Sequence, residues 1–555
     1  CYLELQDPAE ERAALEAWLA LEPDATVAWR AHARASTTLH DPTAARRSWE
    51  RFIELTPPGA ELTEAKYALA LLLDEHLAKP RAAAELYEAV LLERPEDRDV
   101  LARLVRNYAR LGMAERAISL QTKLIQLTQH PREKLTGALD LAQLYEDLAG
   151  DAKRAVATLE RARKAWPTEP APLAALVRFL ERQGEDGKGR LLVERTTKDT
   201  WRKLESERIE ASALGMLATL AELQGLDELA AGAEAARRAW VGEDGSREGA
   251  GASALGAQLD DLLAPTEMSP PLRALLRKTG RAFDAAFPVA VAAQRVESGV
   301  VLDELRELSR AAGLGEVALF VTPSLGARCL PARAALDRGA PHQMLIGPAL
   351  EDLSPDQRTF LLLRGLKLQQ SGAGALARSR SRDSWPMLAA LLNLFAPNWV
   401  PAGIDQEKFL LARQQLEKGL RAVGYDDDVP FLVLEAIGTL TPRAQHLGEA
   451  ARLLPNRAAL LGTGSLGGAV EAFARLADRP LAAAGPARWR WLNGHAEARD
   501  LILFSASRAC AEARVRLGLV TRDSLPEASP VHSLPPRPPQ RSLAGVPPRP
   551  PPRRS

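Results

Sequence analysis

The chain has 555 residues, and its 72 lysines and arginines balance 72 aspartates and glutamates, so the formal net charge is zero. This length exceeds what one hydrophobic core covers, and the zero balance excludes the overall positive field typical of nucleic-acid-binding proteins. Leu, Ala, Arg and Glu dominate while aromatic residues make up 5% of the chain, a composition that favours helices. We expect a mainly helical protein of two large domains that binds no nucleic acid.

The cysteines and the apolar runs limit the class of protein further. Cys1, Cys329 and Cys510 stand far apart without a CxxC pair, so neither a disulfide framework nor a cysteine zinc site is expected. The longest apolar run near the middle, Met387 to Ala396, is about half of the ~20 residues that a membrane-spanning helix needs. The sequence therefore predicts no transmembrane segment.

The first residue, Cys1, permits two interpretations of where the protein works. The chain is either a fragment of a cytoplasmic protein, or a lipoprotein of the cell envelope whose signal peptide was removed ahead of a lipidated cysteine. The cytoplasm is the first expectation and an envelope protein anchored at Cys1 is the alternative.

Prolines punctuate the N-terminal part at intervals of 34, 38, 36 and 36 residues, each after an amphipathic run: Pro23, Pro57, Pro95, Pro131 and Pro167. Between them a small residue recurs, followed four residues later by a second residue on the same helix face. These pairs are Ala45 and Trp49, Ala83 and Tyr87, Ala117 and Gln121, and Ala155 and Leu159. The spacing predicts repeated helix pairs that cross at the small residues.

The clearest unit runs from Arg98 to about Pro131 and resembles the tetratricopeptide repeat closely. The resemblance covers about residues 10–240, and it implies a solenoid of helix pairs over residues 1–240 whose concave groove, lined by first helices, binds a protein partner. Three arginines of one helix face, Arg103, Arg106 and Arg110, are the predicted partner-binding residues. The alternative for these arginines is a solvated basic face.

The second half begins after a stretch rich in glycine and small polar residues, 241–268, which predicts a flexible linker. From 269 to 521 helical patterns surround two short β-prone runs, 317–323 and 342–348. We therefore expect a mostly helical α+β domain with a small sheet.

The segment Leu345 to Gln370 reads as a strand, a turn and a helix that opens with a capping box of Ser354 and Gln357. This succession resembles the core of CAAX-prenyl-protease-type zinc peptidases. That family binds zinc through two histidines one helical turn apart and a later glutamate, and a glutamate beside the first histidine activates water.

This sequence departs from the family at each of those positions. Arg364 and Leu368 stand in the histidine places, Gly365 in the glutamate place and Arg452 in the place of the third ligand. Since an arginine and a leucine cannot ligate zinc, the resemblance implies a degenerate peptidase-like domain without catalytic residues, metal or other cofactor. The alternative is a metal-dependent hydrolase that uses other ligands.

Two further motifs each have two interpretations. Residues 462–467, GTGSLG, match a dinucleotide-binding pattern, but no strand precedes them, which favours a turn between helices. The loop arginines Arg378, Arg380 and Arg382 indicate either a solvated loop or a grip on an anion.

The tail, 522–555, is rich in proline and arginine. Its 533–555 part contains PxxP spacings and has no acidic residue. It predicts a disordered segment with a possible PxxP-type contact to a partner. Taken together, the sequence predicts a non-catalytic scaffold that recruits a protein through its repeats, with a second docking surface on the peptidase-like domain.

Overall fold

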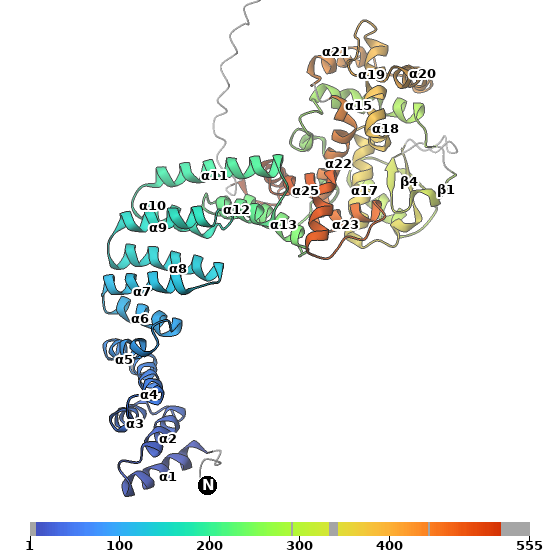
Figure 1. The fold of residues 1–555 in the computed structure, drawn as a ribbon. Helices are drawn as coiled ribbons and strands as arrows, with labels where there is room; N and C mark the ends of the chain where they lie inside the picture. Colours follow the sequence, from blue (N-terminus) through green and yellow to red (C-terminus); the bar gives the residue numbers. More distant parts are fainter. Residues whose placement is uncertain (1–6, 290–291, 332–341, 442–443, 523–555) are drawn as a thin grey trace, which may run out of the picture. The chain divides into compact units, whose positions relative to one another are not determined.

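The structure is a computed structural model that describes residues 7–289, 292–331, 342–441 and 444–522. Contacts divide the chain into two compact units between Asp199 and Thr200 (Figure 1). The predictions for Cys1 and for the PxxP segments of the tail lie outside the described residues. No helix within the described ranges combines the length and apolar character needed to cross a membrane.

The first unit is a stack of antiparallel helix pairs in chain order (Figure 1). Its helices are α1 (Pro8–Leu21), α2 (Thr26–Thr38), α3 (Pro42–Leu55), α4 (Ala60–Leu71), α5 (Pro80–Glu93), α6 (Arg98–Arg110), α7 (Ala114–Leu127), α8 (Pro131–Gln143), α9 (Ala152–Ala165), α10 (Ala171–Arg182) and α11 (Asp186–Ser206), the last of which runs past the division. The aspartates Asp41, Asp97 and Asp151 start helices by accepting from backbone N–H groups.

Small residues lie where the helices cross, as the spacing predicts. Ala45, Ala83, Ala117 and Ala155 are all fully buried on the second helices of their pairs. The residues four positions later, Trp49, Tyr87, Gln121 and Leu159, are buried on the same faces. This confirms the predicted helical-repeat solenoid of tetratricopeptide type.

Two first helices end in a wider turn that the sequence pattern does not predict. The π-helical turns η2 (Leu72–His76) and η3 (Leu144–Leu148) continue α4 and α8. Such a turn bonds i to i+5 and adds a residue to the helix. Each turn carries two adjacent acidic residues near its middle, of which the first is mostly buried and the second exposed: Asp74 and Glu75 in η2, and Glu146 and Asp147 in η3.

The second unit combines a four-stranded sheet with helices. The strands are β1 (Gln294–Arg295), β2 (Val317–Val321), β3 (Cys329–Pro331) and β4 (His342–Ile346), in the order β1-β2-β4-β3. Strands β2 and β4 are parallel and pair Phe320 with Leu345, while β1 and β3 run antiparallel at the two edges. The small sheet predicted from the two β-prone runs is confirmed.

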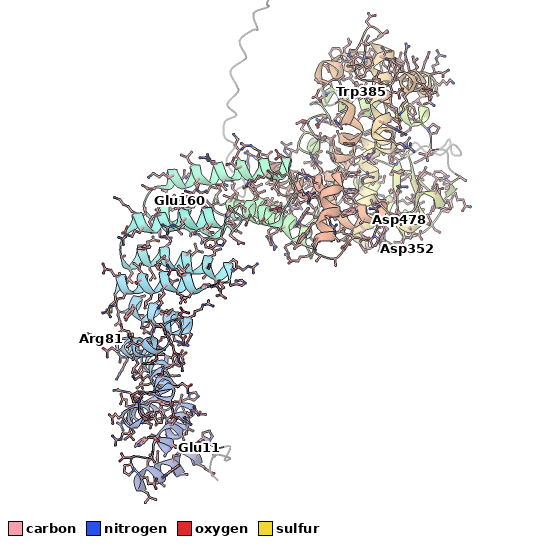
Figure 2. The ribbon with its side chains drawn as sticks, viewed as in Figure 1. Glu11, Arg81, Glu160, Asp352, Trp385 and Asp478 are labelled. Atoms are coloured by element: carbon pink, nitrogen blue, oxygen red, sulfur yellow. The ribbon has the colours of Figure 1, made fainter. Side chains whose placement is uncertain are left out.

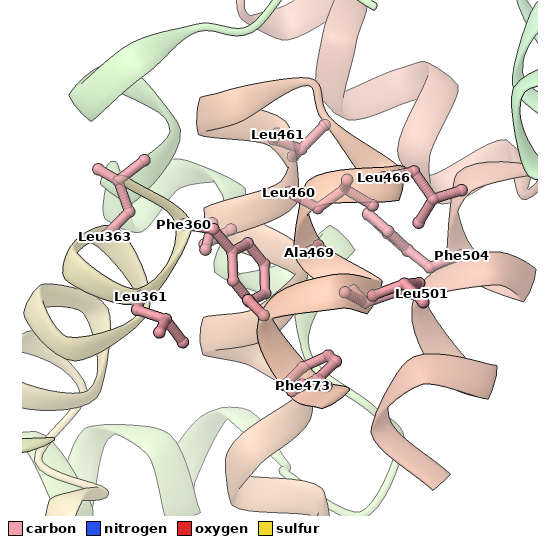
Figure 3. Packing of buried hydrophobic residues seen from close by; sticks show 14 of the residues in the cluster. Phe360, Leu361, Leu363, Leu460, Leu461, Leu466, Ala469, Phe473, Leu501 and Phe504 are labelled. Carbon is pink, nitrogen blue, oxygen red and sulfur yellow. The ribbon is translucent and has the colours of Figure 1, made fainter. Parts of the chain in front are cut away.

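The helices of this unit are α12 (Ala211–Glu222), α13 (Asp227–Val241), η4 (Gly251–Leu255), η5 (Ala257–Leu259), α14 (Asp260–Leu263), α15 (Pro270–Ala286), α16 (Val300–Ala311), η6 (Pro323–Leu325), η7 (Pro348–Leu350), α17 (Pro355–Gln370), α18 (Gly374–Arg378), α19 (Ser381–Phe395), α20 (Gln406–Val423), α21 (Val429–Thr439), η8 (Ala444–His446), α22 (Leu447–Thr463), α23 (Leu466–Leu476), α24 (Pro486–Gly494), α25 (Ala496–Ser505) and α26 (Arg508–Arg516). Figure 3 shows how α17, α22, α23 and α25 bring their apolar faces together. At the centre the rings of Phe360 and Phe473 meet edge to face at 5.5 Å. The predicted helix start holds, because Ser354 caps α17.

The segment 241–268, predicted as a flexible linker, differs from that expectation. Its short helices are packed into the second unit, where Ala254, Leu255, Leu259 and Leu263 are buried. Its charged residue Asp260 lies 2.6 Å from the ammonium of Lys367, a lysine on α17 that is 1% exposed. This stretch is therefore part of a core.

Glycines in this segment serve close packing, which composition alone does not distinguish from flexibility. A Cβ added at Gly249 would stand 2.3 Å from the carbonyl oxygen of Gly462. Gly242 ends α13 with φ +96°, and a Cβ there would lie 1.8 Å from the carbonyl oxygen of Ala483. The preceding pair, α12 and α13, shares the same core through Leu214 and Trp240, so the observed division falls at Asp199 rather than at residue 240.

Candidate functional site

Two grooves of the first unit lie at equivalent places in the repeats. The first, of about 460 Å³, lies between α2, α3, α4 and η2. The second, of about 990 Å³, lies between α6, α7, α8 and η3. Arg34 of the first groove and Arg106 of the second occupy corresponding helix positions, as do Glu61 and Glu133. Each groove is bounded by a first helix that ends in a π-turn.

Side-chain size explains why the second groove is wider. Trp49 and Phe52 line the first groove, whereas Gln121 and Leu124 stand in the corresponding places of the second. The smaller Gln121 turns its amide toward α8 and donates to the backbone oxygen of Gly137 at 2.9 Å. The absence of aromatic side chains from α7 therefore leaves a wider groove here than the one that α3 borders.

The three predicted arginines have different surroundings. Arg106 is exposed and lines the wide groove. Arg103 is only partly exposed, and it donates to Glu75 of η2 at 2.6 Å and to Asp99 at 2.8 Å. Arg110 donates to Asp74 of η2 at 2.8 Å. The structure thus brings Arg103 and Arg110 to the preceding repeat, and it leaves Arg106 at the groove.

The same kind of ion pair, between a π-turn and the end of the next first helix, recurs in the following repeats. Arg182 at the end of α10 donates to both carboxylate oxygens of Glu146 in η3, at 2.8 and 2.7 Å. Asp74 and Arg110 are separated by 36 residues, and so are Glu146 and Arg182. Each π-turn therefore presents a carboxylate to the arginine that ends the next first helix.

The wide groove carries charges of both signs around an apolar floor. Ala102, Val105, Leu124, Ile125 and Leu144 supply apolar side chains to its lining. Some rim charges are already paired, because Arg98 binds Glu133 and Asp99 binds Arg103.

Four rim charges stay without an ion pair among the residues that the structure describes: Arg106, Arg132, Asp140 and Asp147. Arg132 lies in the first turn of α8, whereas Asp140 lies near the end of α8 and Asp147 lies in η3. Desolvation by the groove walls raises the pKa of Asp140, because burial disfavours the charged carboxylate. A carboxylate in this state favours a cationic partner.

In the second unit the structure gathers two of the positions compared with zinc ligands. The Nε of Arg364 donates to Oδ1 of Asn456 at 2.6 Å, and its Nη2 donates to Glu497 at 3.3 Å. Asn456 donates to the same carboxylate at 2.8 Å, and Nη1 of Arg452 lies 3.6 Å from it. Glu497, which the sequence analysis missed, is thus the centre of this cluster.

Electrostatics keep Glu497 charged. Burial alone would raise its pKa, but Arg364, Asn456 and Arg452 outweigh burial and hold the pKa below its ordinary value. No local sequence signal marks this residue, since it lies 133 positions from Arg364.

The other two compared positions serve packing. Leu368 is fully buried among apolar residues of α15 and α19. Gly365 lets α17 approach the sheet, because an added Cβ would stand 3.0 Å from Sγ of Cys329. Within the described ranges, no group of three or more His, Cys, Asp or Glu side chains is placed to hold a metal ion.

The structure also places the GTGSLG motif and the loop arginines. GTGSLG forms the turn between α22 and α23, where Gly464 has φ +67° and Ser465 accepts from the N–H of Gly468. Of the loop arginines, Arg378 binds Asp284 at 2.7 Å and the backbone oxygen of Phe287, while Arg380 and Arg382 lie at the start of α19.

The chain matches no protein-family model and no curated protein. Among solved structures it is similar to the MamA protein, at 14% identity and TM-score 0.25 over 33% of this chain and 97% of MamA. It is also similar to PilW, described as a widely conserved type IV pilus biogenesis factor, at 16% identity and TM-score 0.23 over 35% of this chain and 86% of PilW.

A third similar structure is the C-terminal part of a TPR repeat-containing protein from Cytophaga hutchinsonii, at 14% identity and TM-score 0.28 over 41% of this chain and 87% of that one. TM-scores this low carry no conclusion about function. The repeat fold rests on the helix pairs described above, and the resemblance of the second unit to peptidases gains no support from these comparisons.

Proposed function

We propose that this protein is a non-catalytic interaction scaffold that recruits a protein segment into the wide groove of its helical repeats. The observation that carries the proposal is the groove itself, which combines an apolar floor with unpaired charges of both signs. In the equivalent groove of the first repeats, Trp49 and Phe52 fill part of the space.

The lining specifies the chemistry of the occupant. Apolar side chains of one face of an amphipathic helix would fill the floor, as in helix-in-groove recognition. An acidic residue of the partner would pair with Arg106 or Arg132, and a basic residue would pair with Asp140. Because charged rim residues set orientation and partner choice, this arrangement would fix the direction of the segment.

The second unit would provide a second docking surface on a degenerate peptidase-like domain. The support for this part is that Arg364 and Arg452, the residues at two compared ligand positions, face one carboxylate, that of Glu497. An ion-pair cluster would then occupy the place of the metal. Zinc analysis of the purified protein, with peptide hydrolysis before and after chelation, separates this proposal from the hydrolase alternative.

The groove proposal is tested with the full chain as bait in native lysate and quantitative protein identification. Arg106→Glu and Asp140→Lys each reverse one groove charge without breaking an ion pair of the repeats. Arg81→Glu is the control, because Arg81 is highly exposed on the second helix α5 and outside both grooves, and its reversal disturbs only an exposed pair with Glu85 at 4.0 Å within that helix (Figure 2). Arg103 and Arg110 are unsuitable, since their reversal would also break contacts between repeats.

A genuine partner is captured by the native chain and by Arg81→Glu and is lost from both groove variants. If a partner variant with lysine in place of one acidic residue is captured again by Arg106→Glu, that acidic residue binds at the groove. Equal capture by all four proteins, with helicity unchanged by circular dichroism, would reject the groove as the binding site.

A further inference from the structure

The second unit contains a cavity of about 430 Å³ that the proposed scaffold function does not use. Its walls come from β3 and the loop before it, from α17, α18, α22 and α23, and from the start of α25. Four arginines of separate elements reach it, Arg328, Arg364, Arg378 and Arg452. Four guanidinium groups therefore bring four positive charges to one cavity.

The charges in the lining do not balance. Arg378 is neutralised by Asp284 at 2.7 Å. Arg364 and Arg452 share the single carboxylate of Glu497, with side chains that are only 9% and 23% exposed. Arg328 has no ion pair among the residues the structure describes. The cavity lining therefore holds an excess of two positive charges, one on the exposed Arg328 and one on the mostly buried pair Arg364 and Arg452, where an uncompensated charge is costly.

Hydrogen-bond donors also remain available. A guanidinium has five N–H groups, and Arg364 uses two of them, on Asn456 and Glu497. Arg452 uses two on the backbone oxygens of Ala377 and Ser379. Both side chains line the cavity, and each has N–H groups beyond those used in these bonds. Paired guanidinium groups of this kind match the oxygen spacing of carboxylates and phosphates.

The rest of the lining is apolar or neutral. Phe473, Leu330 and Leu476 contribute hydrocarbon surface. His495 accepts from the N–H of Ala498 through Nδ1 and stacks on Trp491 at 4.7 Å. Desolvation lowers the pKa of His495, which keeps the ring neutral, so it adds no positive charge of its own. An oxyanion with a short apolar body fits this combination.

We propose that this cavity is a binding site for a small organic anion, whose carboxylate or phosphate head binds Arg328, Arg364 and Arg452 and whose apolar part lies against Phe473. The volume suits a ligand of about ten non-hydrogen atoms, at the lower end of small-molecule pockets. Binding at this site is independent of the repeat groove, because every lining residue belongs to the second unit.

The test is calorimetric titration of the full chain at constant ionic strength with three probes of similar size: phenyl phosphate, benzoate and neutral benzyl alcohol. Saturable binding of either anion, without binding of the alcohol, is expected. Preference for phenyl phosphate identifies a phosphate site, and preference for benzoate a carboxylate site. Equal binding of the alcohol, or no binding of either anion, overturns the proposal.

The variant Arg328→Gln provides a second test, because Arg328 is exposed and its replacement leaves the ion pairs of Glu497 with Arg364 and Arg452 intact. Loss of a charged donor should weaken binding of the preferred anion roughly tenfold or more. Arg310→Gln, an exposed arginine of α16 outside the cavity, is the matched control and should bind as the native chain does. Unchanged affinity in Arg328→Gln would place the anion elsewhere and overturn the assignment.

Discussion

Replacement of Lys367 by methionine tests whether residues 241–268 belong to the core of the second unit. The ammonium of Lys367 lies 2.6 Å from Asp260 and 2.8 Å from the backbone oxygen of Leu255, both in that segment. Methionine keeps the length of the side chain and removes its charge. The change leaves the carboxylate of Asp260 buried, with Arg277 at 3.6 Å as its remaining ion-pair partner among the residues that the structure describes.

The expected cost follows from this geometry. Removal of one partner of a buried ion pair destabilises a protein by about 3–5 kcal/mol. Because Arg277 still compensates part of the charge of Asp260, we expect the lower end, about 3 kcal/mol. The double variant Lys367→Met with Asp260→Leu removes both charges and should return to within about 1 kcal/mol of the native chain.

The assay follows urea unfolding through the reaction of Cys329 and Cys510 with a thiol reagent in a Cys1→Ser background. Both cysteines are buried in the second unit, so the label reports its unfolding selectively. Lys408→Met is the matched control, because Lys408 also lies 2.6 Å from a carboxylate, that of Asp383, but both side chains are 35% exposed. The control should cost less than about 1 kcal/mol. Equal costs for the two methionine variants would refute the reasoning.

Three further predictions concern the second unit. The pKa of Glu497 lies below its ordinary value of 4.5, so its carboxylate contributes stability that is fully present above that pH and is lost as the pH falls through the folded pKa. In urea titrations, the difference in unfolding free energy between the native chain and Glu497→Gln should therefore shrink below about pH 4.5. Gly242→Ala should cost about 3 kcal/mol, since its Cβ meets a carbonyl oxygen at a positive φ, whereas Gly313→Ala, at φ +69° with open space, should cost about 1 kcal/mol; similar thermal midpoints would contradict this. Burial raises the pKa of both Cys329 and Cys510 to about 12, so neither thiol should react with a disulfide reagent in the native Cys1→Ser chain near pH 8, and rapid labelling would show that the core opens.

The elements that the sequence predicts well carry local signals. The prolines and small residues of the repeats, and the capping of α17 by Ser354, are short-range features whose consequences appear in the structure as expected. The strands β2 and β4 are apolar runs that stop at proline. The edge strands β1 and β3 have two and three residues, too few for any period to show.

The features that escape prediction depend on distant parts of the chain. The glycines of 241–268 look flexible in composition, and only the backbones of Gly462 and Ala483 reveal why side chains are excluded. A helical face groups Arg103, Arg106 and Arg110, but it does not indicate that η2 places carboxylates within reach of two of them. Likewise Glu497 meets Arg364 only through the tertiary fold.

The π-turns imply that the repeating module of the first unit is two helix pairs long. Turn η2 begins at Leu72 and η3 at Leu144, 72 residues later, and the bond between Asp74 and Arg110 recurs at that interval as the bond between Glu146 and Arg182. Such a pattern is what duplication of an ancestral four-helix block would leave. Engineering that lengthens or shortens this array should therefore add or delete helix pairs in twos, because removal of one pair would set a carboxylate against a helix that lacks its arginine.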